Sequence, residues 1–282
     1  MLDRDGYIPG VPCWVDTSQP DPRAATEFYG GLFGWEFEDR MPSDQPGHYF
    51  IARLEGRDVA AVGSQQDDAA SAPAWNTYVW VDSADDTAAR AADAGGSVLA
   101  EPFDVMNAGR MAVIADPAGA AFCVWQAREH RGAQLVNQAG TWNFSDLNTP
   151  DSEAARAFYG ALFGWDAVHF GAGEESFTTW CLSGYGDFLE QRDPDLRRRQ
   201  EDDQAPDGFE DVVATLVERS DVPPHWGISF TVDDPDATAD RATSLGGEVV
   251  APPFDAGPVR MAMLRDPHGA DFTVGHYDPD SG

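Results

Sequence analysis

The sequence EFYGGLFGW at residues 27–35 decides the fold, because it returns as AFYGALFGW at residues 157–165. The later parts of the two halves match as well. VDSADDTAARAADAGG at residues 81–96 aligns with VDDPDATADRATSLGG at residues 232–247, and RMAVIADPAGAAF at residues 110–122 aligns with RMAMLRDPHGADF at residues 260–272. The chain is therefore an internal repeat. Its 282 residues predict two domains, residues 1–130 and residues 131–282.

Each copy of the repeat predicts a strand, a helix and further strands. Asp21 and Asp151 are residues that favour a helix start. Gly34 and Gly164 end the helix by taking the left-handed conformation, and an outgoing strand follows. The same scheme restarts within each half, so we expect four βαβββ modules. The predicted fold class is α+β, with two cupped, glyoxalase-like mixed sheets and the helices outside them.

Residues 190–224 of the second half have no counterpart in the first half. DPDLRRRQ at residues 193–200 begins with an Asp-Pro pair and predicts a helix. GFEDVVATLVE at residues 208–218 predicts a second short helix, because its apolar residues fall on one side of a helical wheel. This insertion could close over the second cavity as a lid, or it could pack across the interface between the halves.

The composition argues against nucleic acid and membrane partners. The formal net charge is −31, and the eighteen basic residues are all arginines, so a duplex or an anionic bilayer would be repelled. The three scattered cysteines form neither a disulfide framework nor a CxxC metal site. The sequence shows no signal peptide and no apolar run of ~20 residues. We therefore expect a cytoplasmic protein that is a monomer or a homodimer.

Three motifs carry a resemblance to a known family. They are FYxxLFGW after a short strand, VDDxDAT with a Gly pair after the helix, and DPxGxxF before the last strand. The chain resembles the vicinal oxygen chelate superfamily, which includes glyoxalases, bleomycin-resistance proteins and extradiol dioxygenases. More narrowly, it resembles the tandem actinobacterial members, among them a mycobacterial antigen and the "hydroxylase" proteins of aromatic polyketide pathways. The resemblance covers nearly the whole chain and implies a fold more strongly than a reaction.

The resemblance also implies positions for a divalent metal, held by His, Gln or Glu. In this sequence those positions fall on Asn76 and Cys123 in the first half, and on Gly227 and Thr273 in the second. The opening-strand position falls near Cys13 or Trp14 in the first half and near Asn143 or Phe144 in the second. The remaining position falls near residues 60–62, which contain no acid, or residues 187–190, which do. Because apolar or thin side chains do not replace imidazole and carboxylate ligands, we expect no metal and no other cofactor.

Two aspartates, Asp16 and Asp146, occupy the same place in the two opening strands, beside an aromatic residue. Inside a cup such a carboxylate would have a raised pKa and could act as a general base. Alternatively, it is bonded to backbone at the strand end or caps the next helix.

Two arginines, Arg110 and Arg260, recur in the motif RMA. At the rim of a cup either could clamp a carboxylate or an enolate. Alternatively, each pairs structurally with the aspartate that recurs beside it, Asp104 or Asp255.

Aromatic residues on the predicted strands could line a pocket for a flat ligand or pack as core. The candidate ligand-binding residues are Trp14, Asn76, Tyr78, Arg110, Cys123, Phe144, Trp180, Trp226, Arg260 and Thr273. A metal-independent protein that binds a small aromatic or polyketide-like molecule, for sequestration, self-resistance or delivery, fits these features best. The alternative is a metal-independent tailoring enzyme of hydroxylase, isomerase or aldol type, with Asp16 or Asp146 as its base. A metal-dependent glyoxalase or dioxygenase is disfavoured by the missing ligands.

Overall fold

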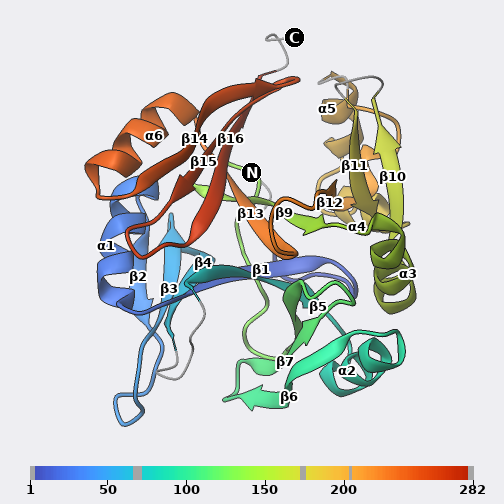
Figure 1. Ribbon diagram of the computed structural model, residues 1–282, viewed down its shortest axis with the longest axis horizontal. Helices are drawn as coiled ribbons and strands as arrows, with labels where there is room; N and C mark the ends of the chain where they lie inside the picture. The colour runs from blue at the N-terminus through green and yellow to red at the C-terminus, as the bar shows by residue number, and fades with distance from the viewer. Residues whose placement is uncertain (1–3, 66–71, 172–175, 203–204, 279–282) are drawn as a thin grey trace.

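The computed structural model describes residues 4–65, 72–171, 176–202 and 205–278 (Figure 1). The first half contains β1 (Pro12–Gln19), α1 (Pro22–Phe33), β2 (Glu36–Asp39), β3 (Tyr49–Leu54), β4 (Arg57–Ser64), β5 (Ala74–Trp80), α2 (Ala84–Asp93), β6 (Ser97–Val105), β7 (Gly109–Ala115) and β8 (Ala121–Ala127). The second half contains β9 (Thr141–Thr149), α3 (Ser152–Phe163), β10 (Asp166–Phe170), β11 (Phe177–Cys181), α4 (Tyr185–Glu190), α5 (Leu196–Asp202), η2 (Phe209–Asp211), β12 (Val212–Glu218), β13 (His225–Thr231), α6 (Pro235–Ser244), β14 (Glu248–Ala256), β15 (Val259–Arg265) and β16 (Asp271–Tyr277). This order confirms the four predicted βαβββ modules.

Each half forms one mixed sheet of eight strands. The strand orders are β2-β3-β4-β1-β5-β8-β7-β6 and β10-β11-β12-β9-β13-β16-β15-β14, so the two sheets have the same topology. At the centre of each sheet the first strands of two modules pair antiparallel. Asp16 on β1 lies opposite Asn76 on β5, and Asp146 on β9 lies opposite Gly227 on β13. The predicted fold class is confirmed.

The helix boundaries follow from the residues at their ends. The side chain of Asp21 accepts the backbone N–H groups of the first turn of α1, and Asp151 does the same for α3. Gly34 and Gly164 close the two helices with φ of 74° and 73°. In this left-handed region a residue without a Cβ is strongly favoured.

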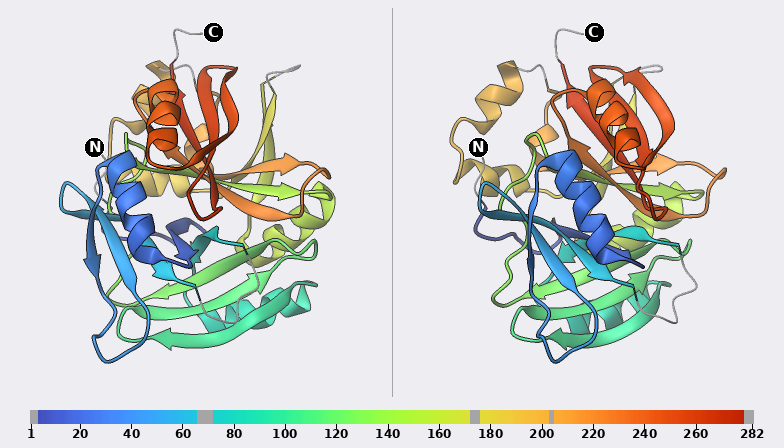
Figure 2. Two further views of the ribbon diagram at one scale, coloured as in Figure 1. Left: turned by 60° about the vertical axis from the view of Figure 1, so that its left-hand side comes forward. Right: turned by 90° about the vertical axis from the view of Figure 1, so that its left-hand side faces the viewer.

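The two sheets pack back to back, and the repeated nonapeptide lies where the halves meet. Thr77 on β5 donates a hydrogen bond to Ser145 on β9 at 2.8 Å, and both side chains are fully buried. The indole Nε1 of Trp35 donates to the carbonyl of Gly140, and that of Trp165 donates to the carbonyl of Gly10, each at 2.7 Å. Figure 2 shows the same exchange between helices, with α1 lying beside α6 of the other half.

The Gly pair after the second helix of each half makes room for the other half. A Cβ on Gly96 would lie 2.7 Å from Phe158 of α3, and a Cβ on Gly247 would lie 3.0 Å from Phe28 of α1. Both phenylalanines are buried, and both belong to the repeated nonapeptide. The two most recognisable motifs of the sequence therefore contact each other across the junction, once in each direction.

The prediction of a helix at residues 208–218 is wrong. One turn of 3-10 helix (η2) is followed by the strand β12, which pairs with β11 on one side and with β9 on the other. The apolar residues of this segment have helical spacing, but its pairing with two neighbouring strands decides its conformation.

The additional part of the second half includes α4 and α5, and its residues 185–192 contact the N-terminal segment of the first half. Arg4 donates to the hydroxyl of Tyr185 at 2.6 Å, and Arg192 pairs with Asp5 at 3.2 Å. These contacts join the two halves. No helix in the described part of the chain is long and apolar enough to cross a membrane.

Candidate ligand-binding site

A cavity of about 520 Å³ lies in the concave face of the first sheet, which we call the first cup. This volume is within the range of sites for small organic molecules. Its walls combine aromatic and apolar side chains with a few polar ones: Trp14, Arg40, Met41, Tyr49, Ile51, Asp58, Tyr78, Val105, Met106, Asn107, Ala108, Met111, Trp125, Glu129 and His130. The strands β1, β3, β5, β7 and β8 contribute to these walls, together with the connector that follows β8.

The carboxylate of Asp16 anchors the tyrosines of the cup. The hydroxyl groups of Tyr49 and Tyr78 donate to Asp16 Oδ2 at 2.9 and 2.7 Å, and the amide of Asn76 donates to Oδ1 at 2.8 Å. Asp16 is 5% exposed and is not among the residues that line the cavity. It therefore lies behind the tyrosines. Asp16 does not bond to the backbone, because its partners are side chains. It does not cap the next helix either, because Asp21 caps α1.

Burial sets the protonation of this cluster. It raises the pKa of the Asp16 carboxyl, and the three hydrogen bonds that the carboxylate accepts partly oppose this effect. Burial and the neighbouring Asp16 carboxylate raise the pKa of the hydroxyls of Tyr49 and Tyr78 well above the ordinary value. Burial also raises the pKa of the Cys123 thiol. The two tyrosines and the cysteine therefore stay protonated at neutral pH.

One wall of the cup is an aromatic cluster that includes His130. The imidazole lies edge-on to the indole of Trp14, with ring centroids 4.4 Å apart, and edge-on to Trp125 at 5.9 Å. Its Nδ1 accepts the backbone N–H of Gly132 at 3.0 Å. Burial lowers the pKa of His130, so the ring is neutral at pH 7.

The second sheet carries different side chains at the equivalent positions. The aromatic residues Trp14, Tyr78 and Trp125 are replaced by Phe144, Ser229 and Gly275. Burial raises the pKa of Asp146, which accepts hydrogen bonds from Thr215 and from Ser229 at 3.3 Å. Hydroxyl groups thus take the place of the tyrosines and the amide that surround Asp16.

The predicted ligand-binding residues fall into separate places. Trp14 and Tyr78 line the cavity of the first cup, and Asn76 and Cys123 lie on neighbouring strands beside Asp16. Trp180 and Trp226 are buried in the core against α3: Trp226 donates to the hydroxyl of Tyr159 at 3.0 Å, and the ring of Trp180 packs against Tyr159 and Trp165. Phe144 and Thr273 lie half-buried on the second sheet.

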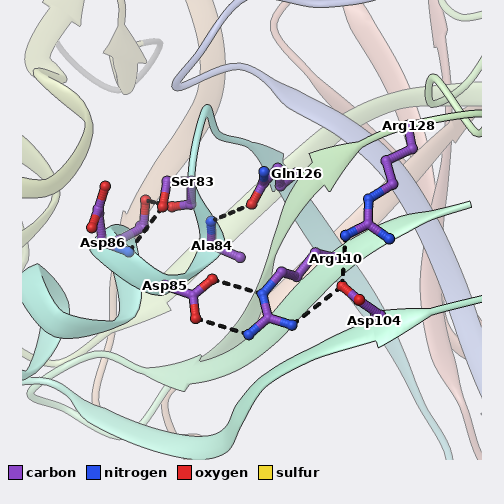
Figure 3. A network of polar contacts seen from close by, with 9 residues as sticks. Ser83, Ala84, Asp85, Asp86, Asp104, Arg110, Gln126 and Arg128 are labelled. Atoms are coloured by element: carbon purple, nitrogen blue, oxygen red, sulfur yellow. Dashed lines mark hydrogen bonds and ion pairs between the residues drawn. The ribbon is translucent and has the colours of Figure 1, made fainter.

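The arginines Arg110 and Arg260 are paired on the surface, as one of the two alternatives for them predicts. Arg110 binds Asp85 at 2.6 Å and Asp104 at 3.2 Å, and Asp104 also binds Arg128 (Figure 3). Arg260 binds Asp236 and Asp255 in the same way, at 2.5 and 2.8 Å. Their carboxylate partners raise the pKa of both guanidinium groups.

The residues at the family's metal positions do not fit a divalent cation. The amide of Asn76 turns its NH₂ group toward Asp16, and Cys123 supplies a single thiol in place of an imidazole or a carboxylate. Gly227 has no ligand atom in its side chain. Among residues 4–65, 72–171, 176–202 and 205–278, no group of three or more His, Cys, Asp or Glu side chains could hold a metal ion.

The comparisons with known proteins agree with this architecture. The family model of the glyoxalase-like domain matches residues 14–125 and residues 144–275. The chain belongs to the glyoxalase-like family. This glyoxalase-like protein carries the family domain twice, once in each eight-stranded sheet.

Two relatives of this glyoxalase-like protein cover nearly all of the chain. CFP32 of Mycobacterium tuberculosis is 37% identical over 279 residues, which is 97% of each chain. The anthracycline biosynthesis protein DnrV of Streptomyces peucetius is 36% identical over 282 residues, covering 95% of this chain and 94% of DnrV. The chain is therefore related to a protein of polyketide biosynthesis.

Solved structures share the fold at low identity. The Mn(II)-bound glyoxalase from Novosphingobium aromaticivorans has a TM-score of 0.59 at 14% identity, covering 96% of this chain and 85% of that one. The 2,3-dioxygenase LapB from Pseudomonas sp. KL28 has the same TM-score and identity, covering 96% and 94%. This likeness concerns the fold alone.

Sequence reasoning missed Tyr49 and His130. Tyr49 comes from β3, two strands away from β1, and reaches Asp16 because the sheet curves. His130 lies in the connector after β8, where no repeat or strand pattern marks it. A signal for Tyr49 did exist, since alternation along a strand that begins there places the tyrosine on one face of the sheet.

Proposed function

We propose that this glyoxalase-like protein binds a small, flat aromatic or polyketide-like molecule in its first cup, without a metal, for sequestration, self-resistance or delivery. The observation that carries the proposal is a cavity of about 520 Å³ walled by Trp14, Tyr49, Tyr78 and Trp125. Aromatic walls favour flat apolar ligands through stacking and edge contacts. The relationship to an anthracycline biosynthesis protein supports a ligand of this class.

The hydrogen bonds around Asp16 support binding as the primary role. A general base has to reach the proton that it removes. The carboxylate of Asp16 is occupied by three donors and separated from the cavity by the tyrosines that it holds. Asp16 therefore acts as a positioning residue that fixes the orientation of both phenol rings.

The proposal is tested with quinizarin, a flat dihydroxyanthraquinone that is uncharged at neutral pH. We expect it to quench the fluorescence of the tryptophans in the cup, with a dissociation constant of about 0.1 mM or lower for a ligand of this size. Absence of binding by both fluorescence and calorimetry would contradict the proposal.

A matched pair of variants locates the site. Met111 lines the first cup, and Met261 holds the equivalent place on β15 of the second sheet. Met111→Glu should weaken quinizarin binding about tenfold or more, because it buries a carboxylate against an apolar ligand. Met261→Glu adds the same charge and should change the affinity less than about twofold. The reverse result would assign the site to the second sheet.

A second candidate is metal-independent tailoring of the bound molecule. The contact of 2.7 Å between Tyr78 and Asp16 favours it, because Tyr78 lines the cavity and could pass a proton to a carboxylate with a raised pKa. Asp146 would take this role in the second sheet. Mass spectrometry of quinizarin incubations would reveal a product that disappears with Asp16→Asn while binding is retained.

A further inference from the structure

The imidazole of His130 has a hydrogen-bonding atom that the protein itself does not use. His130 lines the first cup from the connector between the halves. Since Nδ1 accepts the backbone N–H of Gly132, the neutral ring carries its proton on Nε2. Nε2 is buried and has no hydrogen-bond partner. A buried N–H without an acceptor costs free energy, and an acceptor on a bound molecule would remove that cost.

The other aromatic donors of the cup are already engaged. Tyr49 and Tyr78 donate to Asp16, and the indole of Trp14 donates to the hydroxyl of Tyr49 at 3.1 Å. The indole of Trp125 donates to the backbone carbonyl of His130 at 3.0 Å. In the described ranges, the other buried side-chain atoms without a partner are Arg4 Nε, Trp142 Nε1 and Trp180 Nε1, which do not line the cavity. His130 is the buried donor of the cup that is left for a ligand.

The charges around the cup favour a neutral acceptor over an anion. Asp58 and Glu129 line the same cavity, and Arg40 pairs with Glu38 at 3.2 Å. The whole chain carries a formal charge of −31. A carboxylate or phosphate would be repelled here, whereas the carbonyl oxygen of a ketone or quinone accepts a hydrogen bond without a net charge.

Building on the proposed function, we propose that the first cup recognises a flat aromatic ketone or quinone whose carbonyl oxygen accepts the Nε2–H of His130. The aromatic rings of the ligand lie against the indole wall, and the carbonyl points toward the connector. A small turn of the imidazole accompanies binding, because Nε2 is shielded from water in the free protein. His130 is thus a specificity residue for the carbonyl group.

The test compares two ligands of the same shape, the ketone fluorenone and the hydrocarbon fluorene. Their dissociation constants are measured by tryptophan quenching and by calorimetry on the full-length protein. We expect fluorenone to bind about three- to tenfold more tightly than fluorene, which is the usual net effect of one hydrogen bond.

Two substitutions separate the two ring nitrogens. His130→Asn keeps an acceptor near the place of Nδ1, for the N–H of Gly132, and removes the donor at Nε2. It should bind both ligands equally. His130→Gln places an amide N–H near the position of Nε2 and should restore part of the preference for fluorenone. His48→Asn is the control, since His48 is outside the cup and bonds Asp39 at 2.6 Å; the preference should be unchanged.

Each outcome decides between the inference and the proposed function. Equal affinity of the native protein for both ligands, or a preference that survives His130→Asn, overturns the role of His130 and leaves the binding cup intact. Failure of both ligands and of quinizarin to bind overturns the proposed function, and with it this inference. Thermal melting of each variant establishes that it is folded, and His130→Gln carries the test if His130→Asn is not.

Discussion

Asp16 and Asp146 stand at the same register position of two sheets, yet different groups satisfy their carboxylates. Asp16 receives two phenols and an amide, whereas Asp146 receives two aliphatic hydroxyls. Asp16 is buried and Asp146 is half-buried, so each carboxylate needs hydrogen-bond partners from the protein. The tyrosines that donate to Asp16 are thereby oriented, and their rings line the first cup. The hydroxyl groups that donate to Asp146 belong to smaller side chains. The same residue type at equivalent positions of a repeat can therefore belong to two different sites.

The raised pKa of Asp16 predicts a pH effect on stability. Between the pKa of the unfolded chain and the higher folded pKa, the folded state holds more protons, so the native protein loses stability as pH rises. Asp16→Asn removes this contribution. Relative to the native protein, the variant should gain of order 1 kcal/mol of unfolding free energy as pH rises through this window. Urea unfolding at several pH values from 4 upward measures the difference.

Asp221 provides a control of opposite sign. Its hydrogen bond and ion pair with Arg219 lower its pKa to about 2, so its contribution is present above the unfolded pKa and is lost as pH falls toward 2. Asp221→Asn should therefore lose stability relative to the native protein as pH rises from 2 to 4. A difference between Asp16→Asn and the native protein that does not change with pH would contradict the assignment for Asp16.

At the level of single residues, the sequence pointed to Asp16 and to part of the cavity wall, but not to the rest of that wall. Strand alternation and the register of the repeat identify Asp16, Trp14 and Tyr78. These residues lie on neighbouring strands, where alternation fixes which side chains share a face. Tyr49 and His130 depend on the curvature of the sheet and on the path of the connector, which no local pattern encodes. Trp180 and Trp226 have the same aromatic character as Trp14 but are buried in the core against α3.

At the level of elements, the glycines that follow α1 and α2 have distinct physical roles. Gly34 takes a left-handed φ of 74°, and a Cβ there would meet nothing within 4 Å. Gly96 has no such φ, but a Cβ there would lie 2.7 Å from Phe158 and 2.8 Å from the carbonyl of Ala115. The first glycine is needed for backbone conformation and the second for space.

This distinction predicts unequal costs for the same substitution. Gly34→Ala should lower the unfolding free energy by about 1 kcal/mol, through backbone strain alone. Gly96→Ala should cost about 2 to 3 kcal/mol, because the packing of Phe158 against the first half has to shift. Chemical denaturation of both variants measures these values. Equal costs would show that the close approach at Gly96 relaxes freely.

Local sequence predicted most elements correctly and failed where tertiary pairing overrides local spacing. Caps at Asp21 and Asp151 and the stops at Gly34 and Gly164 were predictable because capping is local. Residues 208–218 have helical spacing, yet β12 forms because the sheet requires a strand between β11 and β9.

At the scale of the whole molecule, the halves exchange helical contacts. Phe28 of α1 packs against Phe272 of β16, and Phe158 of α3 packs against Phe122 of β8. Each core is therefore completed by a helix from the other half. Buried aromatic contacts of this kind supply several kcal/mol each, so neither half retains its full core alone.

We therefore expect the full-length protein to unfold in one transition. Its calorimetric and van't Hoff enthalpies should be equal. Phe158→Ala should cost about 3 to 5 kcal/mol and lower the melting temperature of both halves together. Hydrogen exchange can follow amides of β8 and β16 separately. If the amides of β16 lost their protection from exchange at a much higher temperature than those of β8, the two halves would unfold separately. Two calorimetric peaks in the variant would contradict the prediction in the same way.

In a chain built from two copies of one unit, the segment that joins the copies occurs only once. Residues 128–140 are that segment, and they give His130 to the wall of the first cup and the buried Ala133 and Leu135 to the core. The two cups already differ through the exchange of Trp14, Tyr78 and Trp125 for Phe144, Ser229 and Gly275. The connector adds a difference that no exchange within a copy could supply, because a segment present once can serve only one of the two cups.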